Sequence, residues 1–449
     1  MAHHDSPGGL AELAALMNQP FPPSPAPDDP AEKEKRRRRR RTSRIVALIA
    51  TLVVLGLVAT YVSLSLTAPV SAAVASMHPP QVPIPAAATI ALPQTGEAAV
   101  SVSGANDYLG PEADGVFASS GGNGALPMAS ISKLVTALVV LDAKPLGASG
   151  TGPTITFDKA DHALYDKYFL LNATIAAMPT GSSMSEHDAL ETMLVVSACN
   201  YAEAVADWAF GSNAGFVAAT RRWLAAHGLT GTTLVEPTGI DERNTSTPTD
   251  LIALGKLAIA NPAIASIVAK TSLDVPSLAG MPNTNDLLGT DGVDGIKTGT
   301  LGGSDLLFSA EVRVGAPNPL TIIGIVLAGP DRGAVDNSVR SLITSISDGF
   351  HTLPLAAKGE TVGTYSTPWG STASVVLDRG ASVLTWSNTP VSVRIKTRTV
   401  QSGTNGEKVG TIGWVAGKSS VIVPLALRGR IHEPSTWWRL THPAEVLGW

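Results

Sequence analysis

An uncharged apolar segment near the start of the chain restricts the architecture more than any other feature. The segment at residues 45–66, "IVALIATLVVLGLVATYVSLSL", is 22 residues long and contains no charged side chain. At 1.5 Å per residue such a helix is about 33 Å long, enough to cross the roughly 30 Å hydrocarbon core of a bilayer. A cleaved signal peptide has a shorter apolar core that lies nearer the start of the chain. We therefore expect an uncleaved transmembrane helix over residues 45–66.

The residues on either side of this segment predict its topology. "PFPPSPAPDDPAEKEKRRRRRRTSR" precedes it and is rich in proline and charge, so residues 1–44 are expected to form a disordered cytoplasmic tail. The tail carries nine Lys or Arg against six Asp or Glu, and such a basic flank stays in the cytoplasm. Everything after residue 66 is then expected outside the cell membrane, in a single-pass topology. Residues 67–93 are rich in alanine and proline and predict an extended, semi-rigid linker.

Composition narrows the classes of site that the rest of the chain can hold. The 449 residues exceed one ordinary domain, and a net charge of −5 predicts no nucleic-acid partner. The arginine run could bind nucleic acid, but its place beside the apolar segment favours the topological role. Cys199 is the one cysteine, which excludes an intramolecular disulfide and any site with several cysteine ligands. The nine histidines form no HExxH motif, and we expect no metal and no cofactor.

The periodicity after residue 93 predicts two folded units. Strand-like "AAVSVSG" is followed by helical patterns such as "MSEHDALETMLVV", where Ser185 and Asp188 resemble a helix cap. "DLLFSAEVRV" and "PLTIIGIVLAG" then read as a hairpin joined through "GAPN". Helices between early and late strands predict an α+β domain over residues 94–353, with an antiparallel sheet flanked by helices. Residues 354–449 show strand patterns such as "PVSVRIKTRTV", expected to be half-buried, and predict a small β domain.

A serine and a lysine lie three residues apart at the start of an apolar helical pattern. In "LPMASISKLVTALVVLD", Ser130 and Lys133 would share one face of a helix N-terminus. A lysine among apolar side chains is poorly solvated, which disfavours its charged form. A neutral amine can take the proton of a serine hydroxyl and make it a nucleophile, and the helix end can stabilise the resulting oxyanion. By itself, the pair is better explained by an N-cap serine and a snorkelling lysine.

Two later stretches add to this pair. "GVDGIKTGT" contains Lys297, Thr298, Gly299 and Thr300, and an edge strand of this kind offers an ammonium and hydroxyls to a carboxylate. The glycine lets a ligand or a neighbouring backbone come close. Between the two stretches, Ser197 interrupts the apolar pattern of "MLVVSACNYAEAVADW". Ser-x-x-Lys, a serine turn and Lys-Thr-Gly, in that order, form the signature of the penicillin-recognising serine acyltransferases.

Over roughly residues 90–350 the chain resembles the serine D-alanyl-D-alanine carboxypeptidases, the low-molecular-mass penicillin-binding proteins. "PMASISKLVTALVVLD" is similar to their nucleophile helix. "HGLTGTTLVEPTGIDERNTSTPTDLIAL" resembles a second family segment, including Pro237, Gly239, Thr247 and Asp250, and "NTNDLLGTDGVDGIKTGTLGGSDLLFSA" resembles the run through Lys-Thr-Gly. The resemblance implies a β-lactamase-like transpeptidase fold for the catalytic domain at residues 94–353. A β-rich C-terminal domain, here 354–449, is also usual in that family.

The resemblance further implies a two-step acyl transfer. Ser130 would attack the penultimate D-alanine of a peptidoglycan stem pentapeptide, Lys133 would be its base, and Ser197 would relay a proton to the departing D-alanine. Backbone N–H groups of Ser130 and Thr300 would form the oxyanion hole, and β-lactam antibiotics would acylate the same serine. The residues expected to bind the substrate are Lys297, Thr298, Gly299 and Thr300.

One position departs from the family pattern. The middle motif is expected to be Ser-x-Asn, but Cys199 stands where the asparagine should be. A thiol is a weak donor and acceptor and cannot replace a carboxamide that bonds in two directions. Asn200 could take over through a shift of the turn, with Cys199 as a small buried hydrophobe, so both remain candidate substrate-binding residues. Two functions stay open: an active membrane-anchored carboxypeptidase, and a catalytically impaired homologue that binds peptidoglycan or a cell-wall partner.

Overall fold

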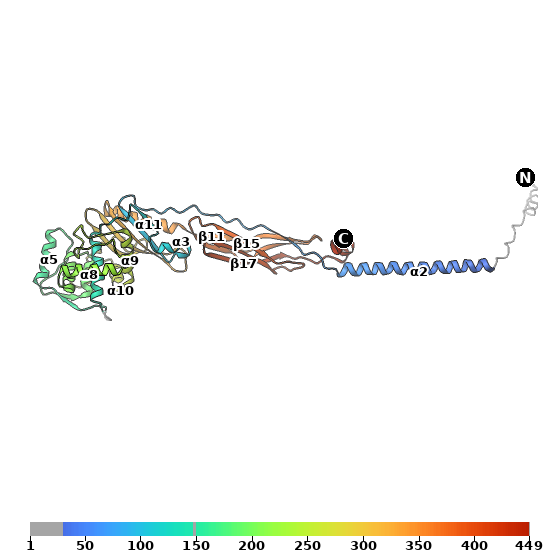
Figure 1. The fold of residues 1–449 in the computed structure, drawn as a ribbon, viewed down its shortest axis with the longest axis horizontal. Coiled ribbons are helices and arrows are strands. Elements are labelled where there is room, and N and C mark those ends of the chain that lie inside the picture. Colours follow the sequence, from blue (N-terminus) through green and yellow to red (C-terminus); the bar gives the residue numbers. More distant parts are fainter. Residues whose placement is uncertain (1–29, 147–149, 449) are drawn as a thin grey trace, which may run out of the picture.

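The computed structural model describes residues 30–146 and 150–448, and its parts follow one another along a single axis (Figure 1). Helix α2 (Pro30–Thr67) projects from one end, a β domain lies in the middle, and an α+β domain forms the far end. The C-terminal end returns to the point where α2 meets the β domain. The chain therefore runs the length of the β domain on its way out and again on its way back.

Helix α2 is longer than the predicted transmembrane segment. It contains residues 45–66 but begins at Pro30, so residues 30–44 are helical where we expected a disordered tail. Proline suits the first helical position, and Lys and Arg are good helix formers. Glu32 and Glu34 each precede an arginine by four residues, a spacing that adds support on the helix surface. The rest of the tail, residues 1–29, lies outside the described residues.

The α+β domain is built on a five-stranded antiparallel sheet in the order β3-β2-β10-β9-β8. The predicted hairpin is confirmed, because β9 and β10 pair with Val312 opposite Leu320. Strand β8, which carries Lys-Thr-Gly, is at an edge of the sheet, as predicted. The strands are β2 (Glu97–Ser103), β3 (Ala118–Ser120), β8 (Val293–Thr300), β9 (Ser304–Val312) and β10 (Leu320–Gly329).

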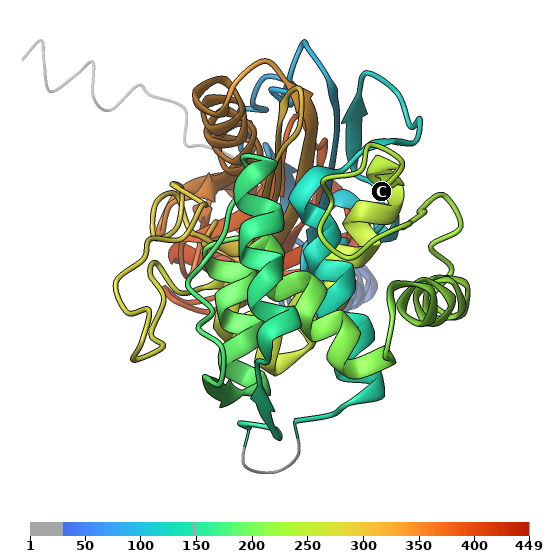
Figure 2. The ribbon, with the colours of Figure 1, turned by 90° about the vertical axis from the view of Figure 1, so that its left-hand side faces the viewer.

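Helices cover both faces of this sheet, which confirms the predicted α+β class. Ala99 and Leu307 point into one core with the central helices, and their neighbours Ala98 and Phe308 point into the other with α11 (Arg332–Asp348). Viewed from the far end of the molecule, the helices gather in front of the sheet (Figure 2). They are α4 (Ser132–Ala143), α5 (Lys159–Leu170), α6 (Glu186–Val195), α7 (Cys199–Phe210), α8 (Asn213–Ala226), α9 (Pro248–Ala260) and α10 (Pro262–Val268).

The β domain consists of a six-stranded sheet in the order β1-β12-β13-β17-β16-β15 and the pair β11-β14. Strand β11 crosses the predicted domain boundary at residues 353–354. The strand predicted to be half-buried is β15, but its Val393 is exposed because β15 is an edge strand. The strands are β1 (Val74–Met77), β11 (Phe350–Ala356), β12 (Thr361–Ser366), β13 (Thr372–Leu377), β14 (Ala381–Trp386), β15 (Val391–Thr397), β16 (Lys408–Ala416) and β17 (Ser419–Gly429).

The linker is extended but is fastened along the body. Strand β1 lies within it and pairs with β12. Farther on, the backbone N–H of Ala88 donates to Ser387 Oγ at 2.9 Å, and that of Ala91 donates to Ser345 Oγ at 3.0 Å. The segment therefore connects α2 to the α+β domain as a strap rather than as a free spacer.

Candidate functional site

Ser130 and Lys133 are in direct contact at the start of α4. Ser130 lies in a 3₁₀ turn, Ala129–Ile131, and is partly exposed, whereas Lys133 is fully buried in the first turn of α4. The Lys133 Nζ donates to Ser130 Oγ at 2.9 Å and to the carbonyl oxygen of Thr238 at 2.7 Å. The arrangement places an amine where it can exchange a proton with an accessible hydroxyl.

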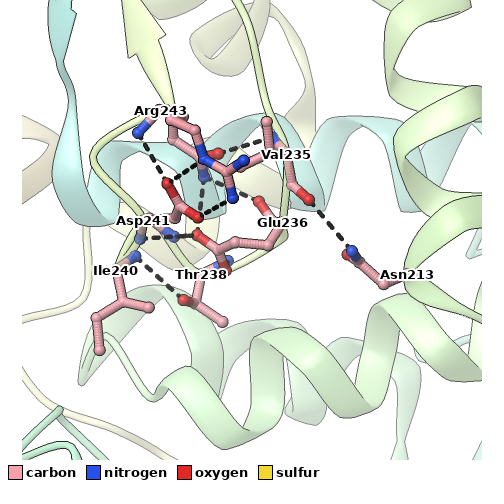
Figure 3. A network of polar contacts seen from close by, with 9 residues as sticks. Asn213, Val235, Glu236, Thr238, Ile240, Asp241 and Arg243 are labelled. Atoms are coloured by element: carbon pink, nitrogen blue, oxygen red, sulfur yellow. Dashed lines mark hydrogen bonds and ion pairs between the residues drawn. The ribbon is translucent and has the colours of Figure 1, made fainter.

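The turn that supplies the Thr238 carbonyl is held by the carboxylate of Glu236 (Figure 3). Its Oε2 accepts from the Thr238 N–H and its Oε1 from the Gly239 N–H, both at 2.7 Å. The amide of Asn244 donates to the same Oε1 at 2.9 Å. Sequence reasoning missed Glu236, although an acidic side chain just before a Pro-x-Gly turn is a signal for such bonds.

The same turn packs directly on the residue before the serine. Gly239 has a φ of +85°, and a Cβ there would lie 1.8 Å from the carbonyl oxygen of Ala129. Only glycine fits both the conformation and the contact. The Glu236 turn and the Ser130 turn therefore form one unit, which explains why a glycine is needed at this position.

Strand β8 lies against the Ser130 turn from the other side. A Cβ at Gly299 would lie 3.1 Å from both Ala129 Cβ and the carbonyl oxygen of Met128. Thr298 is buried, whereas Thr300, at the end of the strand, is exposed. The Lys-Thr-Gly strand and the serine turn, far apart in the sequence, are thus neighbours.

Lys297 is buried beside these groups. Its Nζ donates to Thr284 Oγ1 at 3.3 Å and to the Thr298 carbonyl oxygen at 3.2 Å. Burial first, and then the positive charge of Lys133, hold the pKa of Lys297 well below its usual range. Cys199 acts on the same pKa in the opposite direction. Both lysines and the cysteine are therefore within electrostatic reach of one another.

Two further polar residues border Lys297 and were missed from the sequence. Thr284 Oγ1 accepts from Thr298 Oγ1 at 2.6 Å as well as from Lys297. Arg332, at the first position of α11, donates to the Thr284 carbonyl oxygen at 2.8 Å and pairs with Asp286 at 3.5 Å. The guanidinium is half-exposed and also lowers the pKa of Lys297. No motif marks Arg332, so only the fold could reveal it.

Asp305 is an unexpected carboxyl group beneath Lys-Thr-Gly. It pairs with Gly299 across the β8–β9 ladder and is 6% exposed. The Ala328 N–H donates to its Oδ1 at 2.8 Å, and a Cβ at Gly299 would lie 2.7 Å from Oδ2. Burial raises the pKa of Asp305 to about 6.

The middle motif occupies the junction between α6 and α7. Ser197 has a φ of +66° and is 4% exposed. Cys199 is the first residue of α7 and is buried. Asn200 turns away: its Nδ2 donates to the Ala176 carbonyl oxygen at 2.8 Å, and its Oδ1 accepts from the Ala176 N–H at 3.1 Å. The turn shift that would let Asn200 replace the missing asparagine is absent, and its amide is a structural group.

One group of potential metal ligands occurs within the described ranges. His187, Asp188 and Glu191 place one ligand atom each within 4.8 Å of one another. The Glu191 carboxylate, however, is 1% exposed and already pairs with Lys270 Nζ at 2.6 Å. A cation at this point would have to displace that lysine.

Part of the α+β domain matches a known protein family. Residues 112–317 match the family model described as D-alanyl-D-alanine carboxypeptidase. The chain is also 32% identical over 129 residues to the D-alanyl-D-alanine endopeptidase of Pseudomonas aeruginosa, which covers 29% of this chain. The match spans 38% of the length of that relative.

Solved structures share the arrangement of both domains. Penicillin binding protein 5 from Haemophilus influenzae is 18% identical and covers 80% of this chain and 100% of its own, with a TM-score of 0.50. A peptidoglycan synthesis regulatory factor (PBP3) from Streptococcus pneumoniae is 20% identical and covers 76% and 100%, with a TM-score of 0.51. At these identities the likeness shows the fold, and it confirms the predicted transpeptidase-like domain followed by a β domain.

Proposed function

We propose, because residues 112–317 match the D-alanyl-D-alanine carboxypeptidase family model, that this chain is a membrane-anchored serine carboxypeptidase of the cell wall. Its substrate would be the stem pentapeptide of peptidoglycan, from which it removes the terminal D-alanine. β-Lactams, which mimic the acyl-D-Ala-D-Ala end, would acylate the same serine. The observation that carries this proposal is the 2.9 Å contact between Ser130 Oγ and a fully buried lysine amine.

Acylation would use the two residues in that contact. Ser130 Oγ would bond to the carbonyl carbon of the penultimate D-alanine while its proton passes to Nζ of Lys133, a step that requires this amine to be unprotonated. The Thr238 carbonyl, 2.7 Å from Nζ, keeps the amine aimed at the hydroxyl. Backbone N–H groups of Ser130 and Thr300 would stabilise the oxyanion. The neighbouring position of β8, against the Ser130 turn, supports this pairing.

Substrate binding would use the free edge of β8. An edge strand offers unpaired backbone groups to an extended peptide, which can add as a further strand. Lys297, Thr298 and Arg332 would hold the terminal carboxylate, since their donors gather around Thr284. The proton taken up by Lys133 would pass through the Ser197 hydroxyl to the nitrogen of the departing D-alanine as the peptide bond breaks. Water would then attack the ester carbonyl, and its proton would return to Ser130 Oγ as the acyl–oxygen bond breaks and the shortened peptide leaves.

Cys199 supports the alternative function. Because no carboxamide occupies its position, the lysine and the substrate peptide lose a group that bonds in two directions. If the loss of these hydrogen bonds abolished turnover, the protein would bind peptidoglycan without cleaving it.

The test is acylation and turnover by the detergent-solubilised full chain. We expect fluorescent penicillin to label the wild type and not Ser130→Ala, and D-alanine to be released from a stem pentapeptide. Labelling without release would identify a trapped acyl-enzyme, and no labelling would favour the impaired homologue. Because the Pseudomonas relative is an endopeptidase, a cross-linked dimer of stem peptides is the second substrate. Cleavage of the dimer alone would replace the carboxypeptidase assignment.

The proposed location rests on α2. Among the described residues, α2 is a helix long and apolar enough to cross a membrane. Arginines 36–41 precede its apolar part, which favours a cytoplasmic N-terminus and an extracytoplasmic catalytic domain. We expect externally added protease to degrade the catalytic domain in right-side-out membrane vesicles. Protection of that domain would reverse the topology.

A further inference from the structure

Two short helices late in the sequence contact the end of α2. Helices α12 (Thr436–Thr441) and α13 (Pro443–Leu447), here called the C-terminal collar, lie against the outer end of α2 (Figure 1). The Tyr61 hydroxyl donates to the Leu440 carbonyl oxygen at 2.6 Å. Ser65, one turn farther along α2, is fully buried, whereas residues 30–60 of α2 are exposed. The collar therefore covers one face of the last two turns of α2.

Arg439 of the collar caps this helix. Its NH1 donates to the carbonyl oxygens of Ser65 at 3.4 Å, Leu66 at 3.3 Å and Ala68 at 2.8 Å. The last carbonyls of a helix have no partner within it and carry the negative end of its dipole. Helix α2 has no basic residue in its own last turn. Arg439, which is far away in the sequence, therefore supplies the positive charge that the last turn of α2 lacks.

Tryptophans gather beside the cap. The Trp438 ring stacks on His442 at 4.7 Å and meets Trp369 edge-on at 5.6 Å. The Trp369 indole N–H donates to the His432 carbonyl oxygen at 2.6 Å. Trp437 is left 73% exposed. An indole, with an apolar body and one polar N–H, is enriched where a membrane meets water.

We propose that the C-terminal collar is a second membrane contact, in which Trp437 enters the lipid–water interface of the outer leaflet. This inference rests on the proposed insertion of α2. The apolar run of α2 ends at Leu66, and Arg439 binds the carbonyl of that same residue, so the collar lies at the edge of the hydrocarbon layer. A phospholipid surface is therefore the partner that this position and this side chain fit.

The collar also fixes the anchor to the β domain. Ala73, a few residues beyond α2, donates to the Val400 carbonyl oxygen at 2.7 Å, and β1 of the six-stranded sheet begins at the next residue. With the Arg439 cap, this leaves α2 joined to the β domain at two points. The height and tilt of the body above the bilayer would then be set by the fold rather than by a flexible tether.

The test is label depth in full-length protein reconstituted into vesicles of phosphatidylethanolamine and phosphatidylglycerol. A nitroxide is attached in Trp437→Cys, and in Val54→Cys and Ser392→Cys as controls. Native Cys199 is buried, so the introduced thiol takes the label. We expect the label at 437 to be shielded from a water-soluble nickel chelate, the label at 54 to lie in hydrocarbon, and the label at 392 to remain accessible.

The outcomes separate the collar from the anchor. If the label at 437 is as accessible as the label at 392 while the label at 54 lies in hydrocarbon, the collar does not contact the membrane, although α2 is inserted. A label at 54 in water would overturn both.

Two variants of Arg439 test whether its bonds to α2 hold the collar in place. Arg439→Ala should make the label at 437 mobile and raise its accessibility, while Arg439→Lys, which can still donate to the carbonyls, should restore part of the shielding. Penicillin acylation of either variant in detergent should equal the wild type. An immobile label in Arg439→Ala would show that Arg439 does not hold the collar against α2.

Discussion

Cys199 is the residue that distinguishes the two proposed functions. The structure keeps it at the start of α7, among the groups that influence Lys297, and commits Asn200 to the Ala176 backbone. The sequence could identify the departure but could not choose between the two residues, because a one-residue turn shift leaves the pattern of letters unchanged.

We expect Cys199→Asn to raise turnover of the pentapeptide. A carboxamide can donate and accept at once, and a hydrogen bond to a charged partner contributes about 1.5–3 kcal/mol, roughly tenfold or more in rate. Release of D-alanine measures it. Cys199→Ser, which adds only a hydroxyl, is the matched control and should gain less. An unchanged or lower rate in the asparagine variant would show that another group already fills the role.

Glu236 is expected to position the base through the Thr238 carbonyl. In Glu236→Gln one of the amide N–H groups that now bond to the carboxylate would face an NH₂ donor instead, and the turn would move. We expect penicillin acylation to slow by about tenfold, from the loss of one charge-assisted bond. Asp241→Asn is the control, since Asp241 forms an exposed pair with Arg243. Equal acylation rates in wild type and Glu236→Gln would remove Glu236 from the site.

At the scale of elements, the sequence predicted the hairpin β9–β10, the cap at Ser185 and the edge position of β8. Each depends on local chemistry: alternating apolar residues, a hydroxyl that accepts the Asp188 N–H at 3.0 Å, and a glycine in a strand. Glu236, Thr284 and Arg332 could not be predicted, because their roles depend on which loops the fold brings together. The helical extension of α2 was also missed, because the high charge of residues 30–44 predicted disorder although Lys, Arg and Glu also favour helix.

Asp305, in the β8–β9 pair, makes the free energy of unfolding depend on pH. Its carboxyl ionises near 3.8 in an unfolded chain, but burial raises the folded pKa to about 6. The folded state then binds the extra proton between these values, so the contribution of Asp305 to stability falls as pH rises from 4 to 6 and is level above. The full difference is about 3 kcal/mol, at roughly 1.4 kcal/mol per pH unit.

Asp305→Asn should make the fall in stability between pH 4 and 6 shallower and should be more stable than the wild type above pH 6. Unfolding free energies measured by urea titration between pH 4 and 8 compare the two proteins. Asp348→Asn, at an exposed position of α11, should follow the wild-type slope. Parallel curves for wild type and Asp305→Asn would show that this carboxyl is solvated.

At the scale of the molecule, the order of anchor, linker, α+β domain and β domain follows from composition and periodicity. The path of the linker does not, because proline- and alanine-rich segments look the same whether free or bound. Its hydrogen bonds to Ser345 and Ser387 and the pairing of β1 show that it is bound.

The fastened linker should resist proteolysis. Elastase, which cuts after small residues, would cleave a free "PAAAT" stretch rapidly. We expect the intact chain in detergent to be cut there slowly, and Ser345→Ala with Ser387→Ala, which lack both side-chain acceptors, to be cut faster. Mass spectrometry of the fragments locates the cut. Rapid cleavage of the wild type at residues 86–88 would mean that the strap is open in solution.

The bonds between Arg439 and α2 join positions 371 to 374 residues apart. In the proposed topology the polypeptide is exported from its N-terminal side, so α2 enters the bilayer long before Arg439 emerges. The outer end of α2 then stays uncapped until the residues around 439 have crossed the membrane. A chain that stops before Arg439 would keep α2 and both domains but would lack the cation on the last carbonyls of that helix.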